Sequence, residues 1–564
     1  MRGRGHHAAN RRTRYSYINN GWTSTVPNAR ARRHPHRNGR FGGALISVVV
    51  GVYLAFATLV AAEAAHVLHQ RSTHPLSQAY VPFASDTTPK YLVLMVLDGA
   101  RPDYFGVTAL PHVDALVEQG TRFSNAFSGI LEAETPTGHA TIATGSRPTN
   151  DGILGFDWGN DNDRYSLFNP DQMGTVEQII QDSHAPTIAG LYKKKFPDAR
   201  VVALSGHKYY AAAPLGGPDA DAIMYYQGDP QGHYVPVAVP GHTPPPGVLD
   251  APGVTLPTTH LKNGQEDGLA TTLALTAVKQ MHPRILLINY PEFDWPLGHV
   301  DGGILDRSGV ATDMKNFDSD LARIENTYRS EGILDQTLFV ITADHGMMPI
   351  THFVSASVLD NSLSAAGTTA VDAAANSAEY VWLADAAKAE TVAQNIVNAN
   401  DDGVQSAYYL SSVGGHPRYV AANRSQLSDS EETANQYLLG SLMNGHQPDV
   451  VVVGKEGASF SDPKTNWKAD HGGPTWESEH LPLIIAGPGI RAGQVITAPA
   501  QLDDIAPTVL EDMGVQPTGM QGNVLTDAFV NPPARDTQGR AGEISTLTPV
   551  VDSLIQQSEA AGAP

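Results

Sequence analysis

From residue 90 onward, apolar runs of strand length alternate with amphipathic stretches of helix length. The predicted strands are 90–97, 199–205, 284–290, 336–343, 448–453 and 481–486. The predicted helices include 111–119, 138–144, 174–182, 266–280, 312–330 and 502–513. Continuous apolar strands separated by helices are typical of a buried, mostly parallel sheet covered by helices on both faces. We therefore expect an α/β fold in which ligands bind at the carboxyl ends of the strands.

Three regions depart from this alternation. Residues 207–262 are rich in Pro, Gly and Tyr and are predicted to form loops over the site. Residues 351–446 change in character and predict a small α+β lobe inserted into the sheet domain. The catalytic α/β domain would then comprise 90–350 and 447–530, and residues 531–564 would form a weakly ordered tail.

A long apolar run precedes the globular part. Residues 42–62 are uncharged, and at about 1.5 Å per residue they are long enough to span a bilayer core of about 30 Å. They follow a basic tail, 1–41, that the positive-inside rule keeps in the cytoplasm, and they precede a linker, 65–89. Small residues at the end of the run also suit a signal peptidase, so 42–64 is predicted to be a transmembrane anchor or a signal segment. Both alternatives place the catalytic domain outside the cytoplasm, and the first attaches it to the membrane.

Charge and cysteine content narrow the class of protein. The chain has 37 Lys and Arg against 58 Asp and Glu. Ten Arg and no acidic residue lie within 1–40. The whole chain therefore has a net charge of −21, and the chain without residues 1–40 has a net charge of −31. Such an acidic body is not expected to bind a nucleic-acid duplex. The absence of cysteine excludes disulfides, Cys-based zinc sites, thiol catalysis and a sulfatase nucleophile made from Cys.

Asp and His residues follow several of the apolar runs at the predicted strand ends. They are Asp98, Asp294, His299, Asp344, His345 and His471. Carboxylates and imidazoles gathered at one sheet edge are suitable ligands for a pair of divalent metals, which can clamp the attacking and leaving oxygens of an in-line displacement. Six ligands divide evenly between two sites, so two divalent metal ions are predicted. The Asp/His mixture favours Zn²⁺, with manganese or iron as alternatives.

A threonine is placed to serve as a metal-bound nucleophile. Thr135 lies in ETPTGHATIATG, where the residues from Gly138 onward open a predicted helix. A metal-bound alkoxide is activated at neutral pH, whereas a free threonine hydroxyl is not, and the helix N-terminus would face a phosphate. Thr135 is therefore the predicted nucleophile, with Thr137 as the alternative. The combination indicates hydrolysis or transfer at a phosphate ester, in a nucleotide-like or other small-molecule substrate.

Six segments in order resemble the alkaline phosphatase superfamily, most nearly its type I phosphodiesterase/nucleotide pyrophosphatase branch and its phosphatase relatives. They are VLDGARPDYF, TPTGHATIATGSRPTNDGI, DWPLGH, TADHGM, ADHGGP and LDDIAPTVLEDMGV. The resemblance implies an alkaline phosphatase-like fold and two zinc ions. The ligands that it implies are Asp98, Thr135, Asp344 and His345 for one zinc, and Asp294, His299 and His471 for the other. It also implies that Thr135 attacks phosphorus and forms a covalent phospho-threonine intermediate, which water then releases.

One departure from the family pattern concerns the second metal site. The family spaces its second-site Asp and His as D-x-x-G-H. In this chain Asp294 and His299 are one residue further apart, in DWPLGH. Either the loop bulges at Pro296 or one ligand is assigned wrongly.

Two further departures concern the phosphate pocket. Where relatives place an Asn in G-N-x-W to hold a phosphoryl oxygen, GFDW places Phe156, followed by Asp157. Where monoesterase-like relatives carry S-x-K-x-R, SGHKY places His207 and Tyr209, with Lys208 displaced by one. These five residues are the candidate substrate-binding residues. A monoester dianion needs more donors than a diester monoanion, so their loss favours a phosphodiesterase or nucleotide pyrophosphatase.

Other interpretations stay open. His207 or Lys208 could restore the missing contact, which would suit a phosphatase acting on monoesters. Trp158, Tyr209 and Tyr210 could stack on a flat leaving group or serve only in packing. A phosphoryl or phospho-alcohol transferase would use the same architecture. A catalytically degenerate protein that only binds a metal or ligand is disfavoured by the intact Thr135 and ligand set. The sequence indicates no oligomeric state.

Overall fold

The computed structural model describes residues 88–563, apart from 160–163, 170–171, 173, 230–231, 251–253, 256–260 and 262–263. The predicted basic tail, the anchor or signal segment and nearly all of the linker lie outside the described residues. Within the described part of the chain, no helix is both long enough and apolar enough to cross a membrane.

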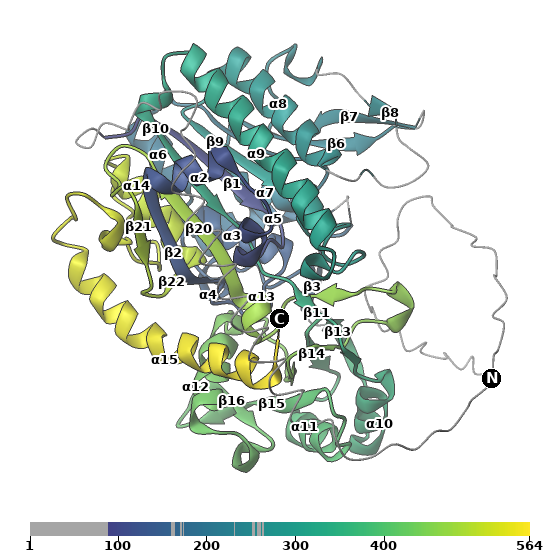
Figure 1. Ribbon diagram of the computed structural model, residues 1–564. Coiled ribbons are helices and arrows are strands. Elements are labelled where there is room, and N and C mark those ends of the chain that lie inside the picture. The colour runs from purple at the N-terminus through teal and green to yellow at the C-terminus, as the bar shows by residue number, and fades with distance from the viewer. Residues whose placement is uncertain are drawn as a thin grey trace, which may run out of the picture. The chain divides into compact units, whose positions relative to one another are not determined.

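The described residues contain one large mixed sheet of eleven strands (Figure 1). Its middle is a block of parallel strands in the order β10 (Thr337–Thr342), β1 (Tyr91–Leu97), β9 (Ile285–Tyr290), β5 (Val201–Ser205) and β6 (Ala222–Gly228). The first four of these strands are almost entirely buried, because their Val, Leu and Ile runs are apolar on both faces. The predicted α/β fold with a central sheet is confirmed.

Antiparallel strands extend the sheet on both sides of this block. On one side, β20 (His480–Ala486) pairs antiparallel with β10 and with β2 (Gly120–Phe127). Two short strands, β21 (Gln494–Ile496) and β22 (Ala500–Gln501), pair with β2. On the other side, β7 (His233–Ala238) and β8 (Val254–Thr255) continue from β6. The sheet is therefore less uniformly parallel than the apolar pattern indicates.

The segment 207–262 is not simply a set of loops. It contains α7 (Tyr209–Gly216) and the strands β6, β7 and β8. The prediction was wrong here because β7 is only partly buried and contains Pro236, which weakens the strand signal, while Pro and Gly mark the turns between the strands.

Helices cover both faces of the large sheet. One group packs together and consists of α2 (Pro111–Glu118), α8 (Gln265–Met281) and α9 (Arg307–Ser330). The other consists of α3 (Thr135–Thr144), α5 (Thr175–Ser183), α6 (Ile188–Lys195), α7 and α14 (Ile505–Asp512). Because α7 and α8 both pack on β5 and β9 yet belong to different groups, the groups lie on opposite faces. The short α4 (Pro148–Asp151) follows α3.

A second sheet forms the small lobe. Its antiparallel strands are β13 (Ala370–Ala375), β14 (Ala378–Leu383), β17 (Val450–Gly454), β15 (Val404–Val413) and β16 (His416–Ala421). Three helices accompany it: α10 (Ala356–Ala366), α11 (Ala389–Asn398) and α12 (Asp429–Leu439). The strand predicted at 448–453 therefore belongs to this sheet, and the lobe continues past residue 446. An all-valine strand is buried in either sheet, so its composition did not indicate which one it joins.

Three pairs of short strands lie outside the two larger sheets. They are β3 (Asp157–Gly159) with β4 (Arg164–Ser166), β11 (Met348–Pro349) with β19 (Ala469–Asp470), and β12 (His352–Phe353) with β18 (Ala458–Ser459). The short helix α13 (Trp476–Glu479) leads into β20.

The C-terminal residues form a long helix rather than a weakly ordered tail. Helix α15 spans Thr537–Ala561 and buries Leu547, Val551 and Leu554. It packs against α12 and α13 and runs along one side of the structure in Figure 1. The prediction failed because two Gly and a Pro lower the helix propensity of this segment, and burial overrides that preference.

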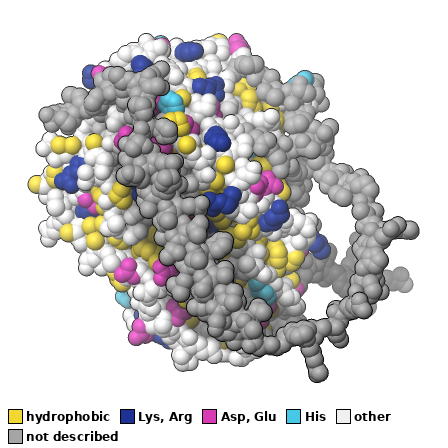
Figure 2. Space-filling view, in the orientation of Figure 1, with side chains coloured by type: hydrophobic (Ala, Val, Ile, Leu, Met, Phe, Trp, Pro, Cys, Tyr) yellow, Lys and Arg dark blue, Asp and Glu magenta, His cyan; other side chains and the backbone are white. Residues whose placement is uncertain are grey.

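Charged side chains are mixed in sign on the described part of the face drawn in Figure 2. Lys and Arg lie scattered among acidic and apolar side chains.

Candidate metal centre

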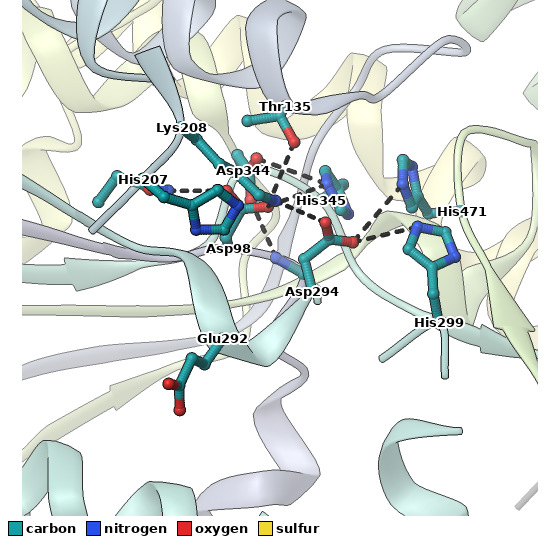
Figure 3. Close-up of polar contacts among 12 residues, drawn as sticks. Asp98, Thr135, His207, Lys208, Glu292, Asp294, His299, Asp344, His345 and His471 are labelled. Carbon is teal, nitrogen blue, oxygen red and sulfur yellow. Dashed lines mark hydrogen bonds and ion pairs between the residues drawn. The ribbon is translucent and has the colours of Figure 1, made fainter. Parts of the chain in front are cut away.

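The carboxyl ends of neighbouring parallel strands bring the predicted residues together. Asp98 directly follows β1, and Asp294 follows β9 through the short helix η4 (Pro291–Phe293). Asp344 and His345 follow β10, and Lys208 follows β5. Because β10, β1, β9 and β5 are adjacent in the sheet, these side chains converge at one edge, as Figure 3 shows.

The predicted second site forms one compact group. The carboxylate Oδ1 of Asp294 lies 3.2 Å from Nε2 of His299 and 3.8 Å from Nε2 of His471. The additional residue between Asp294 and His299 is accommodated by a wide turn, in which the His299 N–H donates to the Asp294 carbonyl at 3.0 Å. A Cβ at Gly298 would approach the Asp294 carbonyl oxygen to 2.8 Å, so this turn requires glycine.

The predicted first site is also assembled. The Thr135 hydroxyl donates to Asp98 Oδ1 at 3.3 Å. Nε2 of His345 lies 3.5 Å from Asp98 Oδ1 and 3.5 Å from Asp344 Oδ2. All four side chains are buried, with at most 2% of their surface exposed.

Within the described residues, three groups of acidic and histidine side chains have ligand atoms within 4.8 Å of one another. They are Asp294, His299 and His471; Asp98, Asp294 and His345; and Asp98, His139 and Asp344. The first group is the predicted second site. The other two share Asp98, so the first-site residues and Asp294 adjoin each other closely.

Three histidines share the arrangement expected of metal ligands. The Nδ1 atoms of His299, His345 and His471 lie 2.9, 2.9 and 3.0 Å from the backbone carbonyl oxygens of Ala469, Gly346 and Ala133. If each Nδ1 carries the proton, each Nε2 keeps a free lone pair directed at the carboxylates. Burial, together with His345 and His299, lowers the pKa of His471 well below its usual value and keeps that ring neutral.

Several atoms at this centre are buried without a hydrogen bond. Asp294 Oδ1, Asp344 Oδ2 and His345 Nε2 have no hydrogen-bond partner among the described residues. Leaving such groups unpaired is costly, and three of them directed at one small region is the pattern that bound cations would satisfy. The residues therefore fit a centre for divalent metal ions.

Lys208 lies between the two predicted sites. Its Nζ is 2.5 Å from Asp294 Oδ2 and 3.0 Å from Asp98 Oδ1, and the side chain is fully buried. Burial alone would lower the lysine pKa, but Asp294 and Asp98 outweigh it and raise the pKa above its usual value. Although displaced by one position in the sequence, Lys208 thus brings a permanent positive charge to the centre.

The carboxylates are held in the charged form. Burial raises the pKa of Asp344, but His345 and His139 outweigh this effect and lower it to about 2. For Asp294, burial is outweighed by Lys208 and His299, and the pKa falls well below its usual value. Both are therefore anionic at neutral pH, as metal ligands must be.

Thr135 begins α3, which presents its N-terminus to the centre. A Cβ at Gly138 would lie 2.5 Å from the Asp344 carbonyl oxygen, so the glycine lets this helix approach the strand-end loop. Thr137 is fully buried and its hydroxyl has no partner among the described residues. Of the two threonines, Thr135 is the one hydrogen-bonded to a predicted ligand, Asp98.

Phe156 and Asp157 do not present donors to the centre. The Phe156 ring stacks on Phe168 with centroids 3.9 Å apart, and its N–H donates to Glu134 Oε2. Burial raises the pKa of Asp157 to about 6. Trp158 is fully buried against Tyr165, so it serves in packing rather than in stacking on a ligand.

His207 and Tyr209 are engaged with other groups. Nδ1 of His207 lies 2.5 Å from Glu266 Oε2. The Tyr209 hydroxyl donates to the Leu167 carbonyl at 2.6 Å, and its ring packs on Tyr210. Of the residues in SGHKY, Lys208 alone contacts the predicted ligands.

Two polar residues at the centre were not identified as site residues from the sequence. Asn289 donates to Asp98 Oδ2 at 2.7 Å, and His139 lies 3.2 Å from Asp344 Oδ2. The signal for Asn289 was a single amide in the otherwise apolar strand ILLINY. The signal for His139 was its place one turn after Thr135 on α3.

A family model described as type I phosphodiesterase/nucleotide pyrophosphatase matches residues 92–474. The alkaline phosphatase PhoK of Sphingomonas sp. is 23% identical over 493 residues, which cover 72% of this chain and 85% of PhoK.

Solved structures share the fold. The alkaline phosphatase PafA has a TM-score of 0.59 at 17% identity, covering 80% of this chain and 100% of PafA. An inactive variant of murine ectonucleotide pyrophosphatase/phosphodiesterase 5 in complex with AMP has a TM-score of 0.52 at 15% identity, covering 77% of this chain and 97% of that one.

Proposed function

The chain belongs to the type I phosphodiesterase/nucleotide pyrophosphatase family of the alkaline phosphatase superfamily, and from this premise we propose that it is a two-metal phosphodiesterase or nucleotide pyrophosphatase with Thr135 as its nucleophile. The observation that carries the proposal is the placement of three buried histidines, each with Nε2 directed at carboxylates, beside the Thr135 hydroxyl. We extend the proposal to a location outside the cytoplasm, which follows from residues 42–64.

The residues divide into two ion sites. Asp98, Thr135, Asp344 and His345 would hold one zinc ion, and Asp294, His299 and His471 would hold the other. When bound, two such ions polarise a phosphoryl oxygen and lower the pKa of a coordinated hydroxyl group.

The protein's own side chains position the reacting groups. Asp98 accepts a hydrogen bond from Thr135 and so orients Oγ1 at the N-terminus of α3. Attack by Oγ1 forms a bond to phosphorus and expels the alcohol or nucleotide leaving group, and water then cleaves the phospho-threonine. The N-terminus of α3 and the Lys208 ammonium group stabilise negative charge on the non-bridging oxygens.

The surroundings of the centre favour a diester. The Phe156 N–H is used by Glu134, and the Phe156 ring is used in packing, so this position supplies no donor to a phosphoryl oxygen. The complex with AMP in the murine relative agrees with a nucleotide-like substrate.

A phosphatase acting on monoesters is the second candidate. Lys208 supports it by bringing a cation to the centre, and PhoK and PafA are named alkaline phosphatases.

Substrate comparison distinguishes the two candidates. We expect kcat/KM for bis(p-nitrophenyl) phosphate to exceed that for p-nitrophenyl phosphate by about tenfold or more, because one missing oxyanion donor costs about 10²–10³ in rate. Steady-state kinetics with zinc-loaded protein measures this ratio. A ratio in favour of the monoester would replace the first candidate by the second.

Substitution of the nucleophile tests the mechanism. We expect Thr135→Ala to lower kcat by about 10³-fold or more, because the residual rate comes only from the electrostatic surroundings. Metal analysis should show zinc content close to that of the wild type, since Asp98, Asp344 and His345 remain. Thr137→Ala is the matched control, which removes a nearby buried hydroxyl from the same helix and should keep most activity. Loss of turnover in the control alone would identify Thr137 as the nucleophile.

A further inference from the structure

A continuous chain of hydrogen bonds lies behind the predicted first metal site. The Lys208 backbone N–H donates to Ser205 Oγ at 3.0 Å, and Ser205 Oγ lies 2.6 Å from Asn289 Oδ1. Asn289 Nδ2 lies 2.7 Å from Asp98 Oδ2 and 3.0 Å from His139 Nε2. His139 Nδ1 lies 2.7 Å from the Thr135 carbonyl oxygen. The side chains of Ser205, Asn289 and His139 are fully buried.

The chemistry of the groups sets the direction of every bond in this chain. Asn289 Oδ1 can only accept, so the Ser205 hydroxyl, which itself accepts from the Lys208 N–H, donates its hydrogen to Oδ1. The two Nδ2 hydrogens of Asn289 are then donated to Asp98 Oδ2 and to His139 Nε2. His139 must therefore accept at Nε2 and donate from Nδ1 to the Thr135 carbonyl oxygen.

His139 has hydrogen-bond partners at both ring nitrogens, unlike the three histidines with ligand geometry. Its ligand atoms lie within 4.8 Å of those of Asp98 and Asp344, which by distance alone would admit a role as a metal ligand. Both of its ring nitrogens are used, however, one by Asn289 and the other by the Thr135 carbonyl. His299, His345 and His471 each use Nδ1 in this way and leave Nε2 for a ligand.

Asp98 receives different partners at its two oxygens. Asn289 holds Oδ2. Oδ1 lies 3.0 Å from Lys208 Nζ, 3.3 Å from the Thr135 hydroxyl and 3.5 Å from His345 Nε2. The neutral amide of Asn289 thus holds one oxygen on the side away from the predicted ion, and the other oxygen faces the Lys208 ammonium group, the nucleophile and the predicted ion.

We propose that Ser205, Asn289 and His139 form a positioning relay that fixes the Asp98 carboxylate and the first turn of α3, and so sets the geometry of the ion site that contains Thr135. The inference rests on the proposed two-metal function. In this proposal, none of the three residues contacts the substrate or a metal ion. They act through Asp98, through the Thr135 carbonyl and through Asp344, whose Oδ2 lies 3.2 Å from His139 Nδ1. Their loss weakens one ion site while leaving the Asp294, His299 and His471 site intact.

The test measures zinc affinity directly, by competition with a chromogenic chelator, in the wild type and in Asn289→Ala. We expect one of two zinc equivalents to bind about 10–100-fold more weakly in the variant, the usual effect of removing a group that orients a metal ligand. The other equivalent should keep its affinity. kcat should fall, while KM for the aryl diester changes little, because the relay does not contact substrate.

Two further variants separate the relay from general packing. Ser205→Ala removes only the hydroxyl that orients the Asn289 amide, and it should weaken the same zinc equivalent to a smaller extent. Tyr290→Phe is the matched control. It removes a buried hydrogen bond to Thr271 from the neighbouring residue of β9 and should leave both zinc affinities within about twofold of the wild type.

The outcomes are distinct. Unchanged zinc affinities in folded Asn289→Ala and Ser205→Ala would overturn the relay while leaving the proposed function in place. Loss of a whole zinc equivalent in His139→Gln, with both retained in Asn289→Ala, would make His139 a ligand and also overturn it. Wild-type protein that binds no zinc and has no turnover after zinc supplementation would overturn the proposed function, and the relay with it.

Discussion

At the residue scale, the backbone fixes the orientation of the imidazoles at the centre. His299, His345 and His471 each have Nδ1 beside a carbonyl oxygen, so a ring flip would replace this hydrogen bond by a C–H contact, and the other tautomer would place the Nδ1 lone pair against an oxygen lone pair. The carbonyls belong to Ala469, Gly346 and Ala133, so these contacts use the backbone and not the side chains of those residues. The geometry of the ligands therefore depends on the path of the chain as much as on the ligands themselves.

A buried carboxyl group away from the centre makes stability depend on pH. Burial raises the pKa of Asp151 to about 8, against the opposing effect of hydrogen bonds from the Ile153 N–H and the Thr144 hydroxyl. Folding therefore favours the protonated form. This contribution is complete below the unfolded-state pKa of about 4 and is lost as pH rises through the folded-state value.

We expect the wild type to lose stability relative to Asp151→Asn between about pH 4 and pH 8, by roughly 1.4 kcal/mol per pH unit. The amide has a similar shape but does not ionise. Urea unfolding of both proteins at several pH values in this window measures the difference. Parallel pH profiles for the two proteins would show that folding does not raise the pKa of Asp151.

Most of the candidate ligands could be predicted from the sequence because they follow an apolar run, and adjacent parallel strands end at the same sheet edge. His471 instead precedes the apolar run of β20. The relay could not be predicted in this way. Asn289 and His139 lie within a strand and a helix and not after an apolar run, and the two partners of the Asn289 amide nitrogen, Asp98 and His139, are distant from it in the sequence. The contact of Lys208 with Asp98 depends on the turn after β5, which a one-residue displacement in the motif did not reveal.

At the element scale, α15 contacts separate parts of the described chain and holds them together. Arg540 donates to Asp527, to Glu543 and to the Pro499 carbonyl near one end of the helix. Near the other end, Gln557 interacts with Gln405 of β15, and Ser558 donates to Glu477. The helix thus links the large sheet domain to the small lobe.

We expect Leu554→Ala to lower the free energy of unfolding by about 2–5 kcal/mol, because Leu554 is fully buried in α15 and its truncation leaves a cavity. Chemical denaturation followed by circular dichroism measures the loss. Gln556→Ala, at an exposed position of the same helix, is the matched control and should change stability by less than about 0.5 kcal/mol. Equal stability of both variants would mean that α15 contributes little to the fold.

The strands of the parallel block and most of the long helices could be predicted from apolar periodicity. The pattern failed where burial is one-sided or where tertiary packing overrides propensity. β7 is partly exposed, and α15 contains Gly539, Gly542 and Pro549. The apolar pattern also did not distinguish parallel from antiparallel strands. β20 pairs antiparallel with β10, yet it is as apolar and as buried as the strands of the parallel block.

At the scale of the whole molecule, the centre concentrates negative charge inside an already acidic protein. Asp98, Asp294 and Asp344 are buried together, with Lys208 as the permanent cation in contact with two of them. Two divalent ions would reverse this excess and leave a net positive centre for an anionic phosphate ester. The predicted ions would therefore serve the fold as well as the reaction.

Removing the metals should consequently lower both the activity and the stability of the protein. We expect a strong chelator to abolish turnover and to lower the free energy of unfolding by several kcal/mol, since a ligand present at about 10³ times its Kd contributes about 4 kcal/mol. Differential scanning calorimetry with and without chelator measures the shift, and added zinc should reverse it. A chelator-treated protein with unchanged Tm would show that no metal supports the fold.

The position of β20 also sets the order in which the molecule can be completed during synthesis. This strand lies between β2 and β10 but comes long after both in the chain, and the last predicted ligand, His471, shortly precedes it. A nascent chain that ends before residue 471 therefore leaves β2 without any of its pairing strands and one edge of β10 unpaired, and it holds an incomplete set of ligands. The sheet can close, and the second ion can be captured, only when most of the polypeptide has left the ribosome.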